Sequence, residues 1–489
     1  MTEAAPGIER LDVRAVNAEA NRSLYAKRAK IYPKRAHGRF RTVKWMVMAV
    51  TLGIYYLVPW IRWDRGPYLP DQAVLIDFPS RRFYWFFLEI WPQEFYYITG
   101  LLVLAALALF LVTALAGRVW CGYTCPQTVW TDLMIAVERV FQGDRNARMR
   151  LDKSPWTTEK IWRKGATYVT WLLIAVATGG AFVFYFADAP TLARELVTFE
   201  APLVAYVFIG VLTATTYVLG GIAREQFCTY MCPWPRIQGA MFDRDSLLIS
   251  YRDWRGEPRG AHKAGQGWEG RGDCIDCQQC VAVCPAGIDI RDGPQLECIQ
   301  CSLCIDACNE IMDKVARPRG LIAYDTVRDL EAAGKERLPI KLLRPRVVLY
   351  AAAMVLVGAI MLTALVLRTD LEVSILHDRN PIYVRLSDSG LRNGYTIKLL
   401  NKLYEPRSFR LVIAGLPGAT LSIIGFEHQT NPVVTVPPDE LQSLRLYVTL
   451  DKKGVAALPH EATDFSLVVT DVTNATQSEH EAKFQGPER

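Results

Sequence analysis

The sequence predicts a polytopic α-helical membrane protein with about five spans, an inserted cysteine-rich α+β domain and a C-terminal all-β sandwich. Three observations predict this arrangement. Long apolar runs alternate with very polar stretches along 489 residues, of which 51% are hydrophobic and 22% charged. Eight of the 12 cysteines lie between Cys274 and Cys308. Short runs of alternating hydrophobicity, separated by turn residues, follow Pro381. The chain is also too long for one ordinary domain.

Five segments are apolar enough, and about long enough, to cross a bilayer as helices. They are Val43–Trp60, Phe95–Ala116, Ala166–Ala187, Ala201–Gly221 and Pro345–Leu367. The fourth contains several threonines, so its ends are less well defined. The aromatic stretch Phe83–Trp91 is too short to span a membrane. We interpret it as an interfacial or re-entrant segment, with an ordinary loop as the alternative.

The distribution of lysine and arginine predicts the orientation of these spans. The N-terminal arm and the loop after the second span are basic, whereas the loops Ile61–Glu94 and Asp188–Glu200 are balanced by acids. The N-terminus is therefore predicted to be cytoplasmic, and five spans put the C-terminus outside. The cysteine-rich region then lies in the reducing cytoplasm, where free thiols persist. The first ~40 residues contain no apolar core of a signal peptide. The net charge of +6 gives no reason to expect nucleic acid as a partner.

The strongest motif is a pair of runs that both read Cys-x2-Cys-x2-Cys-x3-Cys. The first is Cys274-Ile-Asp-Cys277-Gln-Gln-Cys280-Val-Ala-Val-Cys284-Pro285, and the second is Cys298-Ile-Gln-Cys301-Ser-Leu-Cys304-Ile-Asp-Ala-Cys308. Three thiolates at this spacing can hold one four-iron cluster, and the fourth cysteine of each run binds the other cluster. The runs predict a two-cluster bacterial ferredoxin domain with two [4Fe-4S] clusters. One is assigned to Cys274, Cys277, Cys280 and Cys308, and the second to Cys298, Cys301, Cys304 and Cys284.

Other interpretations of this region carry less weight. Structural zinc also uses Cys-x2-Cys pairs, but two complete runs of four favour clusters. Asn309 follows the second run where a proline is common, which weakens the argument for a turn there but not the ligation.

The flanking acids are interpreted as solvated surface, with an effect on reduction potential as the alternative; they are Asp273, Asp276, Asp306 and Asp313. None of the histidines has a partner at metal-binding spacing; they are His37, His262, His377, His428, His460 and His480.

A second signal is a pair of Cys-x3-Cys-Pro motifs just past the ends of the second and fourth spans. They are Trp120-Cys121-Gly-Tyr-Thr-Cys125-Pro126 and Phe227-Cys228-Thr-Tyr-Met-Cys232-Pro233. The two cysteines of each motif share a face if the segment is helical, although a short break before the proline is also compatible. Their similar placement suggests that the four thiols meet. Thiolates suit Cu(I), and a thiol pair can donate electrons by forming a disulfide. The alternative is that they are small hydrophobic residues packing at helix ends.

Seven short runs after Pro381 predict an immunoglobulin-like sandwich. They are Tyr383–Leu386, Tyr395–Asn401, Phe409–Ile413, Thr420–Ile424, Val433–Val436, Leu444–Leu450 and Phe465–Thr470. Asn393–Gly394 and Pro437–Pro438 are predicted turns between them. No cysteine lies beyond Cys308, so the sandwich has no inter-sheet disulfide. The glycine-rich, charged segment Arg255–Asp273 is predicted to be a flexible linker.

At these motifs the sequence resembles the FixG/RdxA/CcoG family of accessory proteins for cbb3-type cytochrome c oxidases, a family of ferredoxin-type (polyferredoxin) membrane proteins. The resemblance covers nearly the whole chain. It includes Gly117-Arg-Val-Trp-Cys-Gly-Tyr-Thr-Cys-Pro-Gln-Thr-Val-Trp130, Phe227–Pro233 with Gln238-Gly-Ala-Met-Phe-Asp243, and Cys274–Met312 with Arg319-Gly-Leu-Ile322. The cluster motif alone occurs in many ferredoxins, whereas its combination with the Cys-x3-Cys-Pro pairs is specific to this family.

The resemblance implies a metal (cupric) reductase that converts Cu(II) to Cu(I) for oxidase assembly in the bacterial inner membrane. Cys121, Cys125, Cys228 and Cys232 would bind or reduce copper, and the C-terminal domain would contact partners. The implied partners are cbb3-type oxidase subunits or copper chaperones and transporters; homo-oligomers are also compatible. No flavin or nicotinamide motif identifies the electron donor. Two alternatives stay open, a quinol-linked ferredoxin-type electron carrier and a non-enzymatic assembly scaffold or redox sensor.

The predicted domain organisation follows from these segments. Residues 1–42 form a cytoplasmic basic N-terminal arm, and residues 43–254 form a membrane domain with four spans and both Cys-x3-Cys-Pro motifs. Residues 255–344 hold the cytoplasmic linker and the two-cluster ferredoxin domain. Residues 345–368 form the fifth span, and residues 369–489 form a periplasmic immunoglobulin-like domain.

Overall fold

The computed structural model describes residues 8–487 except 9, 14, 18–28, 68, 263–266, 334–340, 369–370, 404, 427–431, 439 and 459. Parts of the predicted N-terminal arm and linker, and His428, therefore lie outside the described residues. The chain divides into two compact units. One comprises Met1–Trp63 and Gln72–Met361, and the other comprises Asp64–Asp71 and Leu362–Arg489. The first unit contains all the cysteines.

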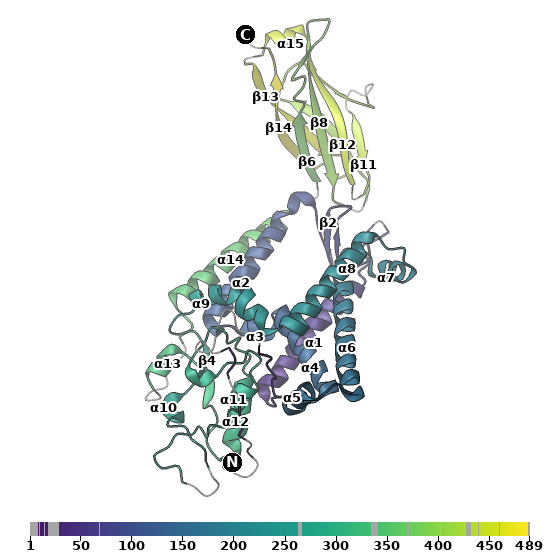
Figure 1. Cartoon of the computed structure of the whole chain (residues 1–489). Helices are drawn as coiled ribbons and strands as arrows, with labels where there is room; N and C mark the ends of the chain where they lie inside the picture. The colour runs from purple at the N-terminus through teal and green to yellow at the C-terminus, as the bar shows by residue number, and fades with distance from the viewer. Residues whose placement is uncertain are drawn as a thin grey trace. The chain divides into compact units, whose positions relative to one another are not determined.

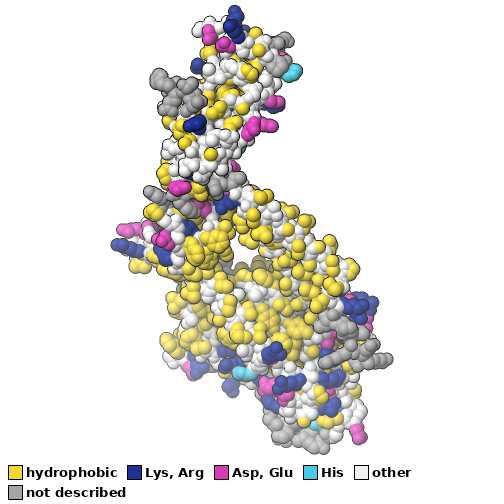
Figure 2. All heavy atoms as spheres, turned by 180° about the vertical axis from the view of Figure 1, so that it is seen from behind, with side chains coloured by type: hydrophobic (Ala, Val, Ile, Leu, Met, Phe, Trp, Pro, Cys, Tyr) yellow, Lys and Arg dark blue, Asp and Glu magenta, His cyan; other side chains and the backbone are white. Residues whose placement is uncertain are grey.

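Within the described residues, five helical segments are long and apolar enough to cross a membrane. They are α1 with η2 (Arg39–Trp60), η3 with α2 (Pro92–Ala116), α6 (Thr158–Val183), α8 with the π-helix η4 (Leu203–Ala223) and α14 (Pro345–Val366). Helices α6 and α8 lie side by side (Figure 1). Figure 2 shows hydrophobic side chains gathered over much of the surface. Leu102 of α2, Leu173 of α6 and Val355 of α14 are exposed. Such a continuous apolar surface fits lipid rather than water, so the predicted polytopic membrane protein is confirmed.

The observed helices agree with the predicted spans except at a few ends. Helix α6 begins at Thr158 rather than Ala166, because Thr157 caps it by accepting a hydrogen bond from the backbone N–H of Lys160. The stretch Phe83–Trp91, interpreted as an interfacial or re-entrant segment, belongs to a three-stranded antiparallel sheet and is not an ordinary loop. Its strands are β1 (Val74–Asp77), β2 (Arg82–Trp85) and β3 (Leu88–Ile90). Aromatic residues on both sides of a tight turn favour strands over helix.

Short helices surround the ends of the spans. The α-helices are α3 (Val119–Tyr123), α4 (Pro126–Gln142), α5 (Arg145–Lys153), α7 (Ala189–Thr198), α9 (Trp234–Met241), α10 (Asp253–Gly256), α11 (Gln279–Ala282), α12 (Leu303–Lys314) and α13 (Val327–Glu331). The 3-10 helices are η2 (Val58–Trp60), η3 (Pro92–Glu94) and η6 (Ile290–Asp292), and the π-helices are η4 (Tyr217–Ala223) and η5 (Phe227–Met231).

The cysteine-rich region folds around a two-stranded sheet. Strand β4 (Leu248–Tyr251) pairs antiparallel with β5 (Ile322–Asp325), and α11 and α12 pack against each other beside them. The described parts of the segment Arg255–Asp273 are not an open linker. The N–H of Asp273 donates to the carbonyl of Arg255 at 2.9 Å, and that of Gly260 donates to the carbonyl of Cys274 at 3.1 Å. The segment is therefore a loop closed on itself, because backbone hydrogen bonds and a buried ion pair outweigh its glycine content.

The second unit is a two-sheet sandwich. One sheet has the order β10-β12-β8-β6, with β7 also paired to β8, and the other has the order β11-β9-β13-β14. The strands are β6 (Leu371–His377), β7 (Val384–Arg385), β8 (Leu391–Asn401), β9 (Arg407–Ala414), β10 (Ala419–Ile423), β11 (Val433–Val436), β12 (Glu440–Leu450), β13 (Ala462–Asp471) and β14 (Gln477–Gln485). Helix α15 (Lys452–Ala456) follows β12. Alternate side chains such as Tyr395, Phe409 and Val448 fill the core between the sheets.

The sandwich differs from the prediction at two places. The predicted turn Asn393–Gly394 lies inside β8, because buried Asn393 exchanges two hydrogen bonds with the backbone of Gln485 in β14. Strands β6 and β14 were not predicted, since β14 is polar and reads Gln-Ser-Glu-His-Glu-Ala-Lys-Phe-Gln. The predicted turn at Pro437–Pro438 does separate β11 from β12.

Candidate functional site

The two cysteine runs have the same backbone conformation around their second cysteine. Asp276 and Gln278 flank Cys277 with φ of 53° and 56°, and Gln300 and Ser302 flank Cys301 with φ of 55° and 62°. Non-glycine residues in this left-handed region cost about 1–3 kcal/mol each. The repeated conformation curls the chain so that the three nearby cysteines face a common space. The Cys-x2-Cys-x2-Cys spacing therefore corresponds to this backbone conformation.

The two runs line two cavities, each with cysteines from both runs. Cys274, Cys277, Cys280 and Cys308 line one cavity. Cys284, Cys298, Cys301 and Cys304 line the other, together with Cys280. The remaining walls are largely apolar, including Ile249, Ile275 and Met312. Burial raises the pKa of Cys280 and Cys304 well above the usual range and that of Cys298 to about 12. Thiolates are stable at such sites only when a bound cationic centre compensates their charge.

The cavities fit a polynuclear cluster better than a single ion. Among the residues that the structure describes, no three His, Cys, Asp or Glu side chains converge closely enough to hold one metal ion. Four thiolates around one tetrahedral zinc would bring their sulfurs to about 3.8 Å from one another. A four-iron cube separates its ligands further. Cysteines spaced around a dry cavity are therefore suited to an iron–sulfur cluster.

The acids beside the runs are not all solvated, which corrects the expectation for two of them. Asp273 is 2% exposed and pairs with Arg255 and Arg317. Asp306 is 5% exposed and accepts the backbone N–H groups of Phe40 and Arg41. Both carboxylates are buried because their partners come from distant segments. Asp276 pairs with Arg10 and Arg291, and Asp313 is exposed as expected and pairs with Arg319.

The described part of the N-terminal arm lies against the first run. The N–H of Leu11 donates to the carbonyl of Cys277 at 3.2 Å, and that of Lys34 donates to the carbonyl of Ala282 at 2.8 Å. Asn17 is 2% exposed and donates through its side chain to the carbonyl of Ala286. Asn309, at the position where proline is common, instead accepts the N–H of Gly320 at 2.9 Å. The arm and this amide close the domain around the cavities.

The first Cys-x3-Cys-Pro motif breaks before its proline. Cys121 lies in α3, whereas Cys125 precedes α4, which starts at Pro126. A proline at the first helical position loses no hydrogen bond. The Cys121 Sγ donates to Oε1 of Gln238 in α9 at 3.2 Å, and Gln238 is fully buried. The two cysteines therefore do not share one regular helix face, and the alternative of a short break is the observed one.

The second motif follows two π-helices. Helix η4 ends the fourth span, and η5 contains Cys228, while Cys232 is extended and precedes Pro233. Between them Arg224 has φ of 47°, in the region that favours glycine. Its Nη2 pairs with Glu138 of α4 at 2.7 Å, and Glu138 also pairs with Arg148 of α5 at 2.9 Å. This buried arginine–glutamate–arginine triad attaches the second motif to the helix that follows the first.

The thiols of the two motifs lie close enough to interact electrostatically, although no three of them converge closely enough, among the described residues, to hold one metal ion. Burial, followed by the proximity of Cys125, Cys121 and Cys232, raises the pKa of Cys228 to about 12. Burial and the neighbouring Cys125 likewise raise the pKa of Cys121 to about 12. Burial also raises the pKa of Cys125. Burial and like-charge repulsion therefore favour the neutral form of the Cys121, Cys125 and Cys228 thiols.

The first motif packs directly on the loop of the second cysteine run. A Cβ at Gly122 would lie 2.7 Å from the carbonyl oxygen of Gln300 and 2.8 Å from that of Ile299. The backbone N–H of Arg118 donates to Oε1 of Gln300 at 2.7 Å. Residues 298–301 carry two cysteines of the second cavity. The first Cys-x3-Cys-Pro motif therefore contacts the loop that lines the second cavity.

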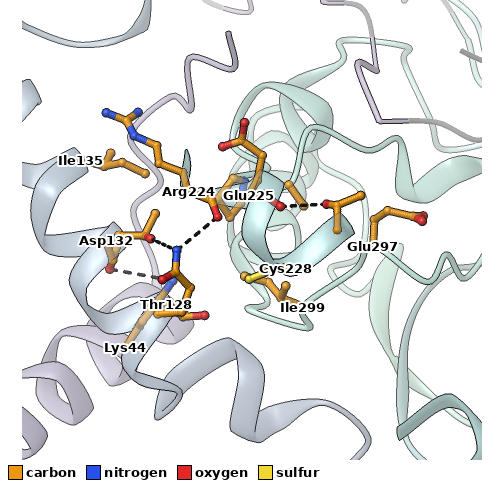
Figure 3. Close-up of a pocket in the computed structure, with 14 residues that line it drawn as sticks. Lys44, Thr128, Asp132, Ile135, Arg224, Glu225, Cys228, Glu297 and Ile299 are labelled. Atoms are coloured by element: carbon orange, nitrogen blue, oxygen red, sulfur yellow. Dashed lines mark hydrogen bonds and ion pairs between the residues drawn. The ribbon is translucent and has the colours of Figure 1, made fainter. Parts of the chain in front are cut away.

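A pocket with about 460 Å³ of empty space adjoins Cys228. Figure 3 shows Thr128, Asp132 and Ile135 on one side, and Cys228, Glu297 and Ile299 on the other. Lys44 and Asp132, at the start of α1 and in α4, form an ion pair of 3.8 Å in its wall. Pro285 and Ile299, which follow cavity cysteines Cys284 and Cys298, complete it. The pocket thus joins the ends of the membrane helices to the second cysteine run.

Several residues of the site were missed by sequence reasoning. Arg118, Glu138 and Gln238 are buried polar residues whose partners are 10 to 182 positions away. Arg118 lies in the stretch Gly117–Trp130 that carries the family resemblance, and no role was assigned to it. Gln238 lies in a motif that carries the family resemblance, which was the available signal.

Three families of known proteins match successive parts of the chain. A 4Fe-4S binding domain matches residues 98–143, and a 4Fe-4S dicluster domain matches residues 223–327. The Ig-like fold at the C-terminus of FixG matches residues 361–487. The dicluster match indicates two iron–sulfur clusters. The predicted all-β sandwich and ferredoxin-type domain are confirmed.

Among the relatives, the nitrogen fixation protein FixG of Rhizobium meliloti is 53% identical over 98% of this chain and 97% of its own length. Protein RdxB of Cereibacter sphaeroides is 51% identical over 95% of this chain and 98% of its own. Protein RdxA of the same organism is 53% identical over 87% and 90%. Identity of this extent, with the cluster families, marks a membrane iron–sulfur electron-transfer protein. The chain belongs to the FixG family of ferredoxin-type membrane proteins.

Proposed function

We propose that this protein is a membrane cupric reductase that converts Cu(II) to Cu(I) during assembly of a cbb3-type cytochrome c oxidase. One observation carries the proposal. Two Cys-x3-Cys-Pro motifs meet, and one of them packs on the loop that holds Cys298 and Cys301. Soft thiol ligands thus lie beside a site for one-electron chemistry.

The eight cysteines of the two runs are proposed as cluster ligands. Cys274, Cys277, Cys280 and Cys308 would hold one [4Fe-4S] cluster, and Cys298, Cys301, Cys304 and Cys284 the second. The bound clusters would supply the storage and delivery of single electrons. The chain itself keeps water away from these cysteines with apolar walls and holds their loops in the left-handed conformation.

The four membrane-flanking thiols are proposed to act on copper. Reduction takes one electron per ion, from Cu(II) to Cu(I), and thiolate favours the Cu(I) product. Binding releases the protons of the thiols involved, because only thiolate is a ligand. Alternatively, two thiols can each give one electron to a Cu(II) ion, release two protons and form a disulfide. In both cases Cys121, Cys125, Cys228 and Cys232 are the reacting groups.

The proposed orientation puts the N-terminus and the ferredoxin domain in the cytoplasm and the immunoglobulin-like domain in the periplasm. The excess of lysine and arginine in the N-terminal arm and the loop after the second span supports it. The periplasmic domain would contact cbb3-type oxidase subunits, copper chaperones or transporters. Deleting the chain after Leu371 separates an adaptor role from reduction. Loss of oxidase assembly with intact copper reduction would identify the domain as an adaptor.

The experiment that tests copper reduction is the double substitution Cys121→Ser, Cys228→Ser in protein loaded anaerobically with iron and sulfide. Copper reduction, followed with a Cu(I) chelator, should be lost, and iron content should stay at about eight atoms per chain for two clusters. Exposed Ser80→Ala is a neutral control outside both motifs. Full activity in the double variant would refute the role of the thiols. Iron near twelve in the wild type, falling to eight in the variant, would instead indicate a third cluster at these cysteines.

The pocket beside Cys228 favours a second candidate function, a quinol-linked electron carrier. Oxidation of a quinol releases two electrons and two protons. The pocket combines apolar walls, such as Ile135 and Ile299, with the acids Asp132, Glu225 and Glu297 as proton acceptors. It also adjoins the ends of membrane helices, where a lipid-soluble donor can enter. This candidate needs no copper.

The test of the carrier is anaerobic reduction of the purified protein by a short-chain quinol without copper, followed by EPR. Ile135→Trp should fill the pocket and slow reduction at least tenfold, whereas Ile237→Trp in exposed α9 should not. Failure of the wild type to accept electrons from quinol would count against the candidate. It would leave cupric reduction by another donor as the function.

A further inference from the structure

Arg118 is a buried cation between the two cysteine-bearing regions. It lies three residues before Cys121 and is 3% exposed. Its Nη1 donates to the carbonyl oxygen of Leu296 and, at 3.3 Å, to that of Cys298, and its Nη2 donates to the carbonyl of Pro235 at 2.5 Å. Its Nε has no partner among the described residues. Neutral carbonyl groups therefore fix the guanidinium without neutralising it.

The other buried arginines of this unit are paired with carboxylates. Arg148 and Arg224 share Glu138, Arg41 pairs with Asp132, and Arg291 pairs with Asp276 and Asp289. Arg118 makes no ion pair with any described residue. An uncompensated charge in a protein interior is costly, so buried charges are normally paired. This arginine is thus expected to face a negative charge that arises at the site in its working state.

Two groups beside Arg118 can supply that charge. Its charge interacts with the sulfurs of Cys121 and Cys298 and with the carboxylate of Glu297. Cys298 becomes a thiolate when it binds metal, and so does Cys121 when it reacts. One electron taken up by the cluster that Cys298 would hold adds one unit of negative charge beside this cysteine. The Arg118 side chain therefore lies beside the positions at which electron uptake and thiol deprotonation add negative charge.

We propose that Arg118 is a positioning residue that raises the reduction potential of the cluster held by Cys298 and holds the loop of Cys298 in place beside Cys121. A fixed positive charge in a low-dielectric region stabilises the reduced form more than the oxidised form. Its three carbonyl acceptors belong to Leu296 just before the run, to Cys298 of the run, and to Pro235 after Cys232. The same side chain therefore joins both motifs to the cluster loop. The proposal rests on the proposed cluster ligands but not on copper.

Redox titration of the anaerobically loaded protein, monitored by EPR, tests the proposal. With Arg118→Gln, the ratio of reduced to oxidised cluster at a given potential should fall about tenfold for one cluster, which is 59 mV for a one-electron couple. Arg118→Lys keeps the positive charge but lacks the several N–H donors of the guanidinium. The midpoint potential of this variant should stay close to the wild-type value. Arg291→Gln is the matched control. It removes an arginine beside Cys277 and Cys280 and should shift the other cluster instead.

A second variant predicts a shift of opposite sign. Glu297→Gln removes a negative charge beside the same cysteine and should raise the potential that Arg118→Gln lowers. Unchanged midpoints in an iron-replete Arg118→Gln protein would overturn the proposal. Equal shifts in Arg118→Lys and Arg118→Gln would also overturn the proposal, because the hydrogen bonds of the guanidinium rather than its charge would then set the potential. If the Arg118→Gln protein fails to bind iron, the midpoint potentials of Arg118→Lys and Glu297→Gln test the proposal in its place. Because copper is absent, a failed cupric reductase assay leaves this result intact.

Discussion

The two sets of cysteines in this protein are held in different ways. The eight cysteines of the ferredoxin runs are arranged by local conformation, with a repeated pair of left-handed residues around Cys277 and Cys301. The four thiols at the ends of the membrane spans are brought together by long-range contacts. Glu138 joins two arginines, Gly122 packs on the carbonyl of Gln300, and Gln238 accepts from Cys121. Local spacing thus specifies a cluster site, whereas a site between helices needs tertiary contacts.

The largest difference between the two sets should appear in iron binding. Cys298→Ala removes a proposed cluster ligand that lines the second cavity, and iron should fall from about eight to about four atoms per chain. Cys228→Ala should leave iron unchanged, because this thiol lines neither cavity. Iron and sulfide analysis with EPR measures both. Equal iron loss in the two variants would break the comparison, since it would place Cys228 among the cluster ligands.

The next effect concerns the buried triad that attaches the second motif. Glu138→Gln leaves Arg148 and Arg224 without their shared charge, which should reduce the free energy of unfolding by about 3–5 kcal/mol. Unfolding in mixed detergent micelles measures the change. Glu159→Gln is the control, because its pair with Arg163 is exposed and worth under about 1 kcal/mol. A small effect of Glu138→Gln would mean that the triad does not hold the Cys228 segment.

A smaller effect is expected at the contact between the first motif and the cluster loop. Gly122→Ala puts a methyl group 2.7 Å from a backbone oxygen, so α3 or the loop must move, at a cost of about 1–3 kcal/mol. Gly165→Ala, whose Cβ would meet nothing within 4 Å, is the control. The EPR signal of the second cluster should change only in the first variant. An unchanged signal and stability would show that the two regions do not depend on this contact.

The smallest effect is expected at Gln238. Gln238→Leu removes the acceptor of the Cys121 thiol and should cost about 1 kcal/mol. Because the thiol donates this hydrogen bond, the bond stabilises the protonated form of Cys121, and its loss should speed alkylation of this thiol by iodoacetamide at pH 8. Mass spectrometry of the labelled peptide measures the rate. Thr113→Val, which removes a hydrogen bond on the far side of Gln238, should change it less. Slower labelling in Gln238→Leu would contradict the hydrogen bond.

Much of this arrangement follows from the sequence because its causes are local. Apolar length predicted the spans to within a few residues, except at α6, where the cap at Thr157 lies outside the apolar run. Alternating hydrophobicity predicted seven strands of the sandwich, whose core residues face one side. Strand β14 was missed because its pairing with β13 stabilises a polar sequence. Asn393 looked like a turn because its true partner, Gln485, is 92 residues away.

The sequence by itself determined the membrane class, the two ferredoxin-type cysteine runs and the all-β domain, since spacing and periodicity act over a few residues. Only the tertiary structure decided which cysteine loop contacts the membrane-flanking motif. It also showed that Asp273 and Asp306 are buried, and that Arg118 stands between Cys121 and Cys298 without a carboxylate partner among the described residues. These features depend on segments that are far apart along the chain, and no local pattern encodes the burial of a charge.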